Sequence, residues 1–289
     1  MSLKNLLTLS GVLVFVALGV LLTPIAQAEE TTPVVLKVMS YNIQIGATTQ
    51  NPGWDVKKFN LDAIAEVIRE QDPDIVALQE VDRLRSRSGK ADQVVYLAEK
   101  LGMYWAYSPS YFDIETREGR GMYGNAILSK YPIVSSYAHT LWRRGQLMPG
   151  EYDWVIEKRS ILETKIDVNG RLINVFSTHL STTADQRQIQ TAEIKTLLTQ
   201  MKGPKILMGD FNAKPQDPEM KNLSRYVDVL EQSPIKGSQR ATWPNGTAST
   251  EAIDYILVSK EWELKEAKVV IEETGASDHN PIVAIISLP

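Results

Sequence analysis

The feature that most restricts the fold of this chain is a series of short apolar runs, each of which stops at a polar residue. Residues 34–41 are rich in β-branched side chains and precede Asn42, and a second apolar run over residues 74–79 precedes Glu80. Runs of this length and composition predict buried β-strands. Polar residues at the ends of such strands can converge on one rim of a sheet. The same pattern recurs along the chain at His179, Asp210, Asn212, Asp254, Asp278 and His279.

Helical patterns separate many of these strand-like runs. Residues 61–68 carry an apolar stripe at helical spacing, and a polar segment over residues 182–201 carries another, which is typical of a surface helix lying on a sheet. The helices are too few to cover a fully parallel sheet, and we find no internal repeat. The pattern predicts an α/β fold in which two packed mixed β-sheets are flanked by helices, a four-layer α/β sandwich. Further strands are expected at residues 124–128, 160–167, 172–177, 206–209, 253–258 and 282–286, and loops at residues 82–90, 113–122, 142–154 and 233–250.

The first 28 residues are typical of a secretory signal peptide. They combine Lys4 with an apolar run over residues 12–22 and end in Ala26-Gln27-Ala28. A membrane-spanning helix needs about 20 apolar residues, so this run suits a cleaved signal better than an uncleaved anchor, which is the alternative. We expect a signal peptide over residues 1–28 and one domain over residues 29–289, exported to the periplasm or outside the cell, without stable membrane association after cleavage.

Composition limits the binding partners. The chain has 31 basic and 35 acidic residues and a formal net charge of −4. Proteins that bind nucleic acid without sequence preference usually present a basic face, so the acidic balance weakens, without excluding, a nuclease interpretation. The chain has no cysteine, and its fold therefore uses no disulfides. We expect a monomer.

Several motifs resemble those of the endonuclease/exonuclease/phosphatase superfamily, in that superfamily's order. They are SYNIQIG, IVALQEV, YGNAILS, STHLS, MGDFNAKP, AIDYILV and SDHNPIVA, and they extend over residues 38–286. MGDFN followed by SDHxP about 70 residues later is the most specific part. The resemblance implies a metal-dependent phosphoesterase that uses one-step, in-line attack by water.

The residue types agree with that chemistry without the resemblance. Glu80, with Asn42 and Asp278, offers the oxygen ligands that Mg²⁺ prefers, and Mn²⁺ would accept the same set. A closed structural zinc site is disfavoured, because the chain has no cysteine and only three histidines. A metal ion and histidine together would stabilise charge on phosphoryl oxygens.

The resemblance also implies a role for each of five residues. His279 would act as general base or hold charge at the phosphate, and Asp254 would fix its tautomer. Asp210 would orient the attacking water, Asn212 would donate to the phosphoryl group, and His179 would donate to a non-bridging oxygen. Each polar residue taken singly could instead be an ordinary turn or cap residue at a strand end. Their joint occurrence in one family order favours catalysis.

Three residues are candidates for contact with the substrate. Asn125 lies in YGNAILS and resembles a position behind the catalytic residues, and Arg87 follows Glu80 in an arginine-rich loop that could equally be solvated. Trp243 resembles an aromatic-proline loop beside the cleft, with core packing as its alternative. His139 matches no motif, and we expect a structural or solvent-exposed role for it.

The sequence leaves the substrate open. A phosphodiester or phosphomonoester is expected; within that chemistry the alternatives are a secreted nuclease acting on DNA or RNA, a phospholipid or sphingomyelin head group, and a soluble phosphomonoester. A catalytically inactive binding module on the same fold is the alternative of another class, but it would need the loss of a motif residue, and none is lost. Many relatives have a basic residue before the IDYI motif, where this chain has Glu251-Ala252.

Overall fold

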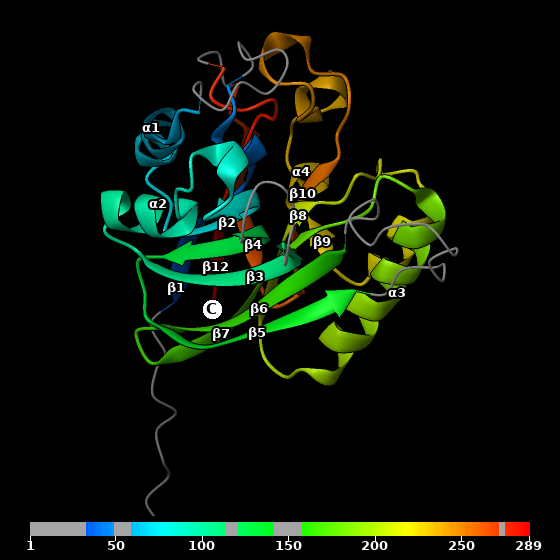
Figure 1. The fold of residues 1–289 in the computed structure, drawn as a ribbon. Coiled ribbons are helices and arrows are strands. Elements are labelled where there is room, and N and C mark those ends of the chain that lie inside the picture. The colour runs from blue at the N-terminus through cyan, green and yellow to red at the C-terminus, as the bar shows by residue number, and fades with distance from the viewer. Residues whose placement is uncertain (1–32, 49–58, 114–120, 142–157, 272–274) are drawn as a thin grey trace, which may run out of the picture. The chain divides into compact units, whose positions relative to one another are not determined.

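The computed structural model describes residues 33–48, 59–113, 121–141, 158–271 and 275–289. These residues form two six-stranded sheets (Figure 1), with strand orders β11-β12-β1-β2-β4-β3 and β5-β6-β7-β8-β10-β9. Both sheets are mixed, because β1 runs parallel to β2 and β7 runs parallel to β8, whereas the other paired strands are antiparallel.

The elements have the following bounds. The first sheet contains β1 (Val34–Asn42), β2 (Ile75–Arg83), β3 (Tyr104–Asp113), β4 (Gly121–Ser129), β11 (Glu263–Val269) and β12 (Ile282–Leu288). The second contains β5 (Ile133–Leu141), β6 (Arg159–Val168), β7 (Arg171–His179), β8 (Lys205–Asp210), β9 (Val227–Asp228) and β10 (Asp254–Val258). The α-helices are α1 (Leu61–Gln71), α2 (Gln93–Leu101), α3 (Ala184–Gln200) and α4 (Val229–Gln232).

Side-chain alternation along the strands explains the layers. On β1, Leu36 and Val38 belong to the core between the two sheets, whereas Met39 and Tyr41 pack with residues of α1 and α2 on the other face. On the second sheet, α3 packs Ile194 and its other apolar residues against the outer face. This arrangement confirms the predicted four-layer α/β sandwich with its two packed mixed sheets.

The predicted elements can be compared with the structure where it describes them. The helix expected at residues 182–201 is α3, and the strand expected at residues 124–128 extends further in both directions as β4. The signal peptide, the loop expected at residues 142–154 and residues 114–120 of the loop expected at residues 113–122 lie outside the described residues. The remaining ends of that second loop, Asp113 and Gly121–Met122, belong to β3 and β4. Among the helices that are described, none is long and apolar enough to cross a membrane.

Candidate active site

The polar strand ends of the two sheets meet at one place. Asn42 ends β1, His179 ends β7 and Asp210 ends β8, while Asp254 begins β10. Strand pairing places Asp210 directly opposite both His179 and Asp254 in the second sheet. Hydrogen bonds then join Asp210 to Asn42 of the first sheet, so the convergence predicted from the sequence is present.

Glu80 reaches this place because β2 is irregular. The register of β2 with β4 shifts between Leu78 and Val81, and Glu80 has a left-handed backbone with φ of 59°. A β-bulge re-aims the side chains at the break in a strand, and a left-handed conformation is uncommon for a residue other than glycine. In a regular strand consecutive side chains point to opposite faces. The bulge instead lets Glu80 face Asn42 while its neighbour Gln79 faces the second sheet and donates to Ser177 Oγ at 3.3 Å.

Gly209 allows β7 and β8 of the second sheet to approach closely beside His179 and Asp210. A Cβ atom at this position would lie 2.0 Å from the carbonyl oxygen of Thr178 on β7. Any side chain would therefore force β7 and β8 apart beside His179 and Asp210. The glycine of the MGDFN motif is explained by this close approach of the two backbones.

Asn42 is the hub of the cluster. Its Nδ2 atom donates to Glu80 Oε1 and to Asp210 Oδ2, both at 3.1 Å, and lies 3.5 Å from His279 Nε2. Its Oδ1 atom accepts from the backbone N–H of Gln44 at 3.1 Å, which fixes the orientation of the amide. Asn42 thus presents a hydrogen-bond donor to two acids, and a role as an oxygen ligand for a metal would require the amide to turn over and lose the bond from Gln44.

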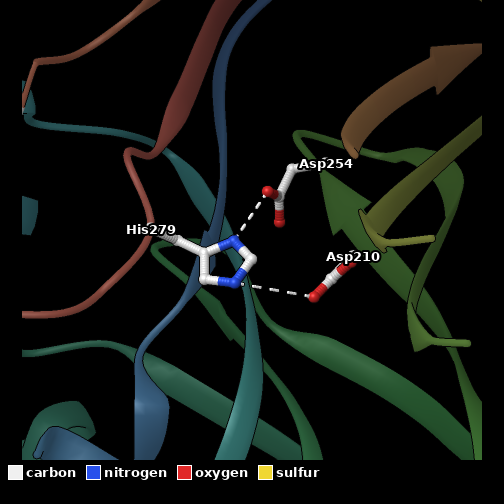
Figure 2. Close-up of side chains that lie close together, drawn as sticks. All are labelled: Asp210, Asp254 and His279. Carbon is white, nitrogen blue, oxygen red and sulfur yellow. Dashed lines mark hydrogen bonds and ion pairs between the residues drawn. The ribbon is translucent and has the colours of Figure 1, made fainter. Parts of the chain in front are cut away.

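His279 lies between two carboxylates (Figure 2). Its Nδ1 atom donates to Asp254 Oδ2 at 2.8 Å, and its Nε2 atom lies 3.8 Å from Asp210 Oδ2. All three residues are buried. Asp254 therefore holds the ring by one nitrogen and directs the other toward Asp210, which is the orientation predicted for this pair.

The charges of this group act on one another. Burial disfavours a charged ring, but the negative charge and hydrogen bond of Asp254, followed by the charge of Asp210, raise the pKa of His279 to about 10. Burial, and then the charge of Asp254, raise the pKa of Asp210 to about 6. At neutral pH the ring of His279 is therefore a buried cation, and the pKa of Asp210 lies close to neutral pH.

His179 and Asn212 form a second pair at the ends of β7 and β8. Asn212 Nδ2 lies 3.0 Å from both His179 Nε2 and the carbonyl oxygen of Leu180. Since that carbonyl can only accept, the amide nitrogen is correctly placed, and it faces His179 Nε2, which also lies 3.4 Å from Asp210 Oδ2. Burial, and then the charges of Arg159 and His279, lower the pKa of His179 well below 6.5, so its ring is neutral.

The donor set suits a hard divalent cation. Glu80 and Asp210 share the amide of Asn42, and Asp254 and Asp278 both act electrostatically on His279. Burial, and then the negative charge of Asp254, raise the pKa of Asp210, and a bound cation would favour its charged form. Asp210, Asp254 and His279 also offer ligand atoms within 4.8 Å of one another. His279 and Asp254 of this trio already hydrogen-bond to each other.

The predicted substrate residues have different surroundings. Arg87 donates twice to the buried carboxylate of Asp82, at 2.8 Å each, and stacks 5.1 Å from the Tyr123 ring centre, so most of its guanidinium is already used. Asn125 is buried and donates to the carbonyl oxygen of Ser160 at 3.0 Å, between the sheets. Both residues brace the structure around the site, and the substrate contacts predicted for them find no support in these bonds.

Trp243 and Asp278 lie together at the rim. The indole Nε1 atom of Trp243 lies 3.4 Å from Asp278 Oδ2, and the side chain is 38% exposed, so the core-packing alternative is wrong. Glu251, of the Glu251-Ala252 pair before the IDYI motif, pairs with Lys214 at 3.0 Å. His139 lies on β5 and contacts Glu163 at 2.7 Å, away from the cluster, as expected.

Sequence reasoning gave no role to two residues that fix the site. Ser277 Oγ donates to the backbone oxygen of Asn42 at 2.6 Å and accepts from the N–H of His279 at 3.3 Å. Thr242 Oγ1 accepts from the backbone N–H of Asp254 at 3.3 Å. Ser277 lies in the SDHN motif and Thr242 precedes Trp243-Pro244. A hydroxyl group beside a catalytic motif was the one sequence feature that could have indicated their roles.

Comparison with known proteins finds relatives in sequence and in fold. The chain is 27% identical over 274 residues to sphingomyelinase C of Bacillus cereus, covering 82% of this chain and 79% of that protein. Among solved structures, an endonuclease/exonuclease/phosphatase from Beutenbergia cavernae has a TM-score of 0.68 and 25% identity, covering 88% of this chain and 72% of that one. The mannosyl-6-phosphatase of Bacteroides thetaiotaomicron shares the fold, with a TM-score of 0.66 and 21% identity over 87% of this chain and 99% of that one.

The model of one protein family matches most of the chain. It extends over residues 39–279, and therefore contains every residue of the cluster from Asn42 to His279. The chain belongs to the endonuclease/exonuclease/phosphatase family of phosphoesterases.

Proposed function

We propose that this protein hydrolyses a phosphate ester, with a divalent cation, by in-line attack of water. The observation that carries the proposal is the hydrogen-bonded set of Asn42, Asp210, Asp254 and His279, in which a buried cationic ring and a buried acid with a raised pKa face each other. Hydrolysis at phosphorus requires one group that takes a proton and another that stabilises negative charge. Both groups must be held in place and away from solvent.

The residues divide the work as follows. Asp210 accepts a hydrogen bond from the attacking water and takes its proton, since its pKa of about 6 is close to neutral pH. His279, held protonated by Asp254, stabilises the negative charge that develops on the phosphoryl group. This favours the charge-holding role over the general-base role for His279. Asn212 would donate to the phosphoryl group, and the neutral ring of His179 would donate to a non-bridging oxygen from the nitrogen that carries its proton.

Glu80 and Asp278, with Asn42 nearby, would hold Mg²⁺ or Mn²⁺. Their oxygens are the hard ligands that such ions take, and the acids lie beside the proposed catalytic pair. When bound, the cation supplies further charge stabilisation to the phosphoryl oxygens and lowers the pKa of water.

The first substrate class to test is a phosphodiester with a lipid head group, because the relatives include sphingomyelinase C of Bacillus cereus and a phospholipase C of Staphylococcus aureus. The net charge of −4 and the neutralisation of Lys214 by Glu251 favour such a substrate over the nucleic acid of the alternative nuclease. We further propose that the protein is exported and acts as a monomer.

The experiment is a substrate panel with the purified protein. Sphingomyelin, phosphatidylcholine, plasmid DNA, RNA and sugar phosphates are incubated with Mg²⁺ or Mn²⁺, and again after treatment with EDTA. We expect turnover of at least one ester that EDTA abolishes and that added metal restores. Full turnover in metal-free buffer would contradict the metal-dependent mechanism, and no turnover of any ester would favour the inactive binding module.

A further inference from the structure

The buried face of α3 changes character along its length. Its C-terminal half buries the apolar Ile194 and Leu198, whereas its N-terminal half buries Arg187, Gln190 and Thr191. Burying an arginine is costly unless every contact is well placed, so the polar half of this face calls for a reason. That half lies next to the loop that follows His179.

Arg187 joins two loops that carry catalytic residues. Its Nη1 atom donates to the carbonyl oxygen of Thr182 at 2.8 Å, in the loop after β7 and His179. Its Nε atom donates at 2.6 Å to Glu219 Oε1, in the segment after β8 and Asn212. Both side chains are almost fully buried. The planar guanidinium can hold a carbonyl and a carboxylate at fixed angles, which a lysine cannot do.

The loop after His179 is fixed from its other side as well. Gln190, one turn along α3, accepts from the backbone N–H of Ser181 at 3.0 Å. The carbonyl oxygen of Leu180 accepts from Asn212 Nδ2, and the N–H of Leu180 donates to the backbone oxygen of Asp210 at 2.9 Å. Residues 180–182 are therefore held between α3 and the end of β8.

We propose that Arg187 and Glu219 form a positioning pair that sets the distance between His179 and Asn212. The proposal rests on the proposed function for these two residues, and it adds a residue pair outside every motif used above. A buried ion pair contributes little net stability over apolar residues of similar size. The pair therefore acts on geometry, and a displacement of about 1 Å of a group at a reacting centre can lower a rate roughly 100-fold.

The test is the double variant Arg187→Met/Glu219→Met, which leaves no unpaired buried charge. We expect it to fold, with kcat lowered roughly 10- to 100-fold and KM changed by less than about threefold, because the affected residues act on the phosphoryl group. Arg187→Lys keeps the charge but loses the planar guanidinium, and it should lose activity in the same way. This single variant replaces the double variant in the test if the double variant does not fold. Leu198→Ala is the control: it creates a cavity under the same helix, lowers stability, and should leave kcat unchanged.

A second readout is independent of turnover. The ¹⁵N resonances of the His179 ring should report one preferred tautomer in the wild type and the same one in Leu198→Ala, because that variant leaves the 3.0 Å contact between Asn212 Nδ2 and His179 Nε2 in place. In the double variant and in Arg187→Lys this preference should be lost. Folded variants with wild-type kcat and an unchanged His179 spectrum would overturn the proposal. If the wild type hydrolysed no ester, the proposed function would fail, and the His179 spectra would still decide whether the pair positions the ring.

Discussion

Replacing Asp254 by asparagine should remove the charge that keeps His279 protonated. The pKa of His279 lies at about 10, against an ordinary value of 6.5, although burial opposes its charge. The difference corresponds to roughly 5 kcal/mol in favour of the charged ring, at about 1.4 kcal/mol for each pKa unit. Asparagine carries no charge, so burial is then opposed mainly by the charge of Asp210, and the pKa of His279 should fall well below 10. An amide can also hold the ring in the wrong tautomer.

The expected result is a fall in kcat by roughly 10² to 10⁴, with a much smaller change in KM, which is the range for a positioned acid or base. His279→Ala should lose a similar amount, and the double variant should be little worse than the worse single variant, because the two residues act as a unit. Steady-state kinetics on the best ester from the panel measures these effects. An NMR titration of the three histidine rings measures the pKa of His279 directly.

The chain offers a matched control in its other histidine–carboxylate pair. His139 contacts Glu163 at 2.7 Å on the surface of the second sheet. Glu163→Gln and His139→Ala should both leave kcat close to that of the wild type. Asp254→Asn with wild-type kcat, or with His279 still protonated at pH 8, would refute the reasoning about the buried pair. Equal losses in the His139 and His279 variants would refute the assignment of roles.

Four further outcomes are expected. Glu80→Gln should weaken Mg²⁺ binding in calorimetry much more than it lowers the melting temperature, and an unchanged metal titration would remove Glu80 from the site. In metal-free protein, the stability contributed by His279 should be complete below about pH 6.5 and lost as the pH rises toward 10, because its pKa is raised on folding; urea unfolding should show a shallower fall over this range in His279→Gln. Gly209→Ala should cost more than about 2 kcal/mol of unfolding free energy, since its Cβ would meet the Thr178 carbonyl at 2.0 Å, and a wild-type unfolding curve would contradict the close approach. The mature protein should begin at or near Glu29 by mass spectrometry, whereas peptides from residues 6–22 in the mature protein would indicate a membrane anchor.

The layers and the location of the site followed from local sequence patterns. Short apolar, β-branched runs gave the strands, and the polar residues that end or begin them gave Asn42, His179, Asp210 and Asp254. The helical stripe at residues 182–201 likewise gave α3. Patterns of this kind depend on a few neighbouring residues, and the sequence contains them directly.

The finer contacts depend on which of several possible partners each polar side chain takes up in the folded chain. From the sequence, the guanidinium of Arg87 could equally face solvent or the substrate, but in the structure it pairs with Asp82. The bulge at Glu80 and the orientation of the Asn42 amide are set by pairing with other strands and by the N–H of Gln44. No local pattern encodes these choices, so the predicted ligand role of Asn42 could not be examined before its hydrogen bonds were known.

The position of Asn42 explains how so many acids tolerate one another between two sheets. Glu80 comes from the first sheet and Asp210 from the second, and their carboxylates would repel each other at close range. The Nδ2 atom of Asn42 donates to both, across 168 positions of sequence in the case of Asp210. An aspartate at this position would supply another acceptor and another negative charge. The asparagine amide instead supplies two N–H donors and carries no charge. The asparagine of the SYN motif therefore bridges the two sheets and separates two carboxylates beside the proposed cation site.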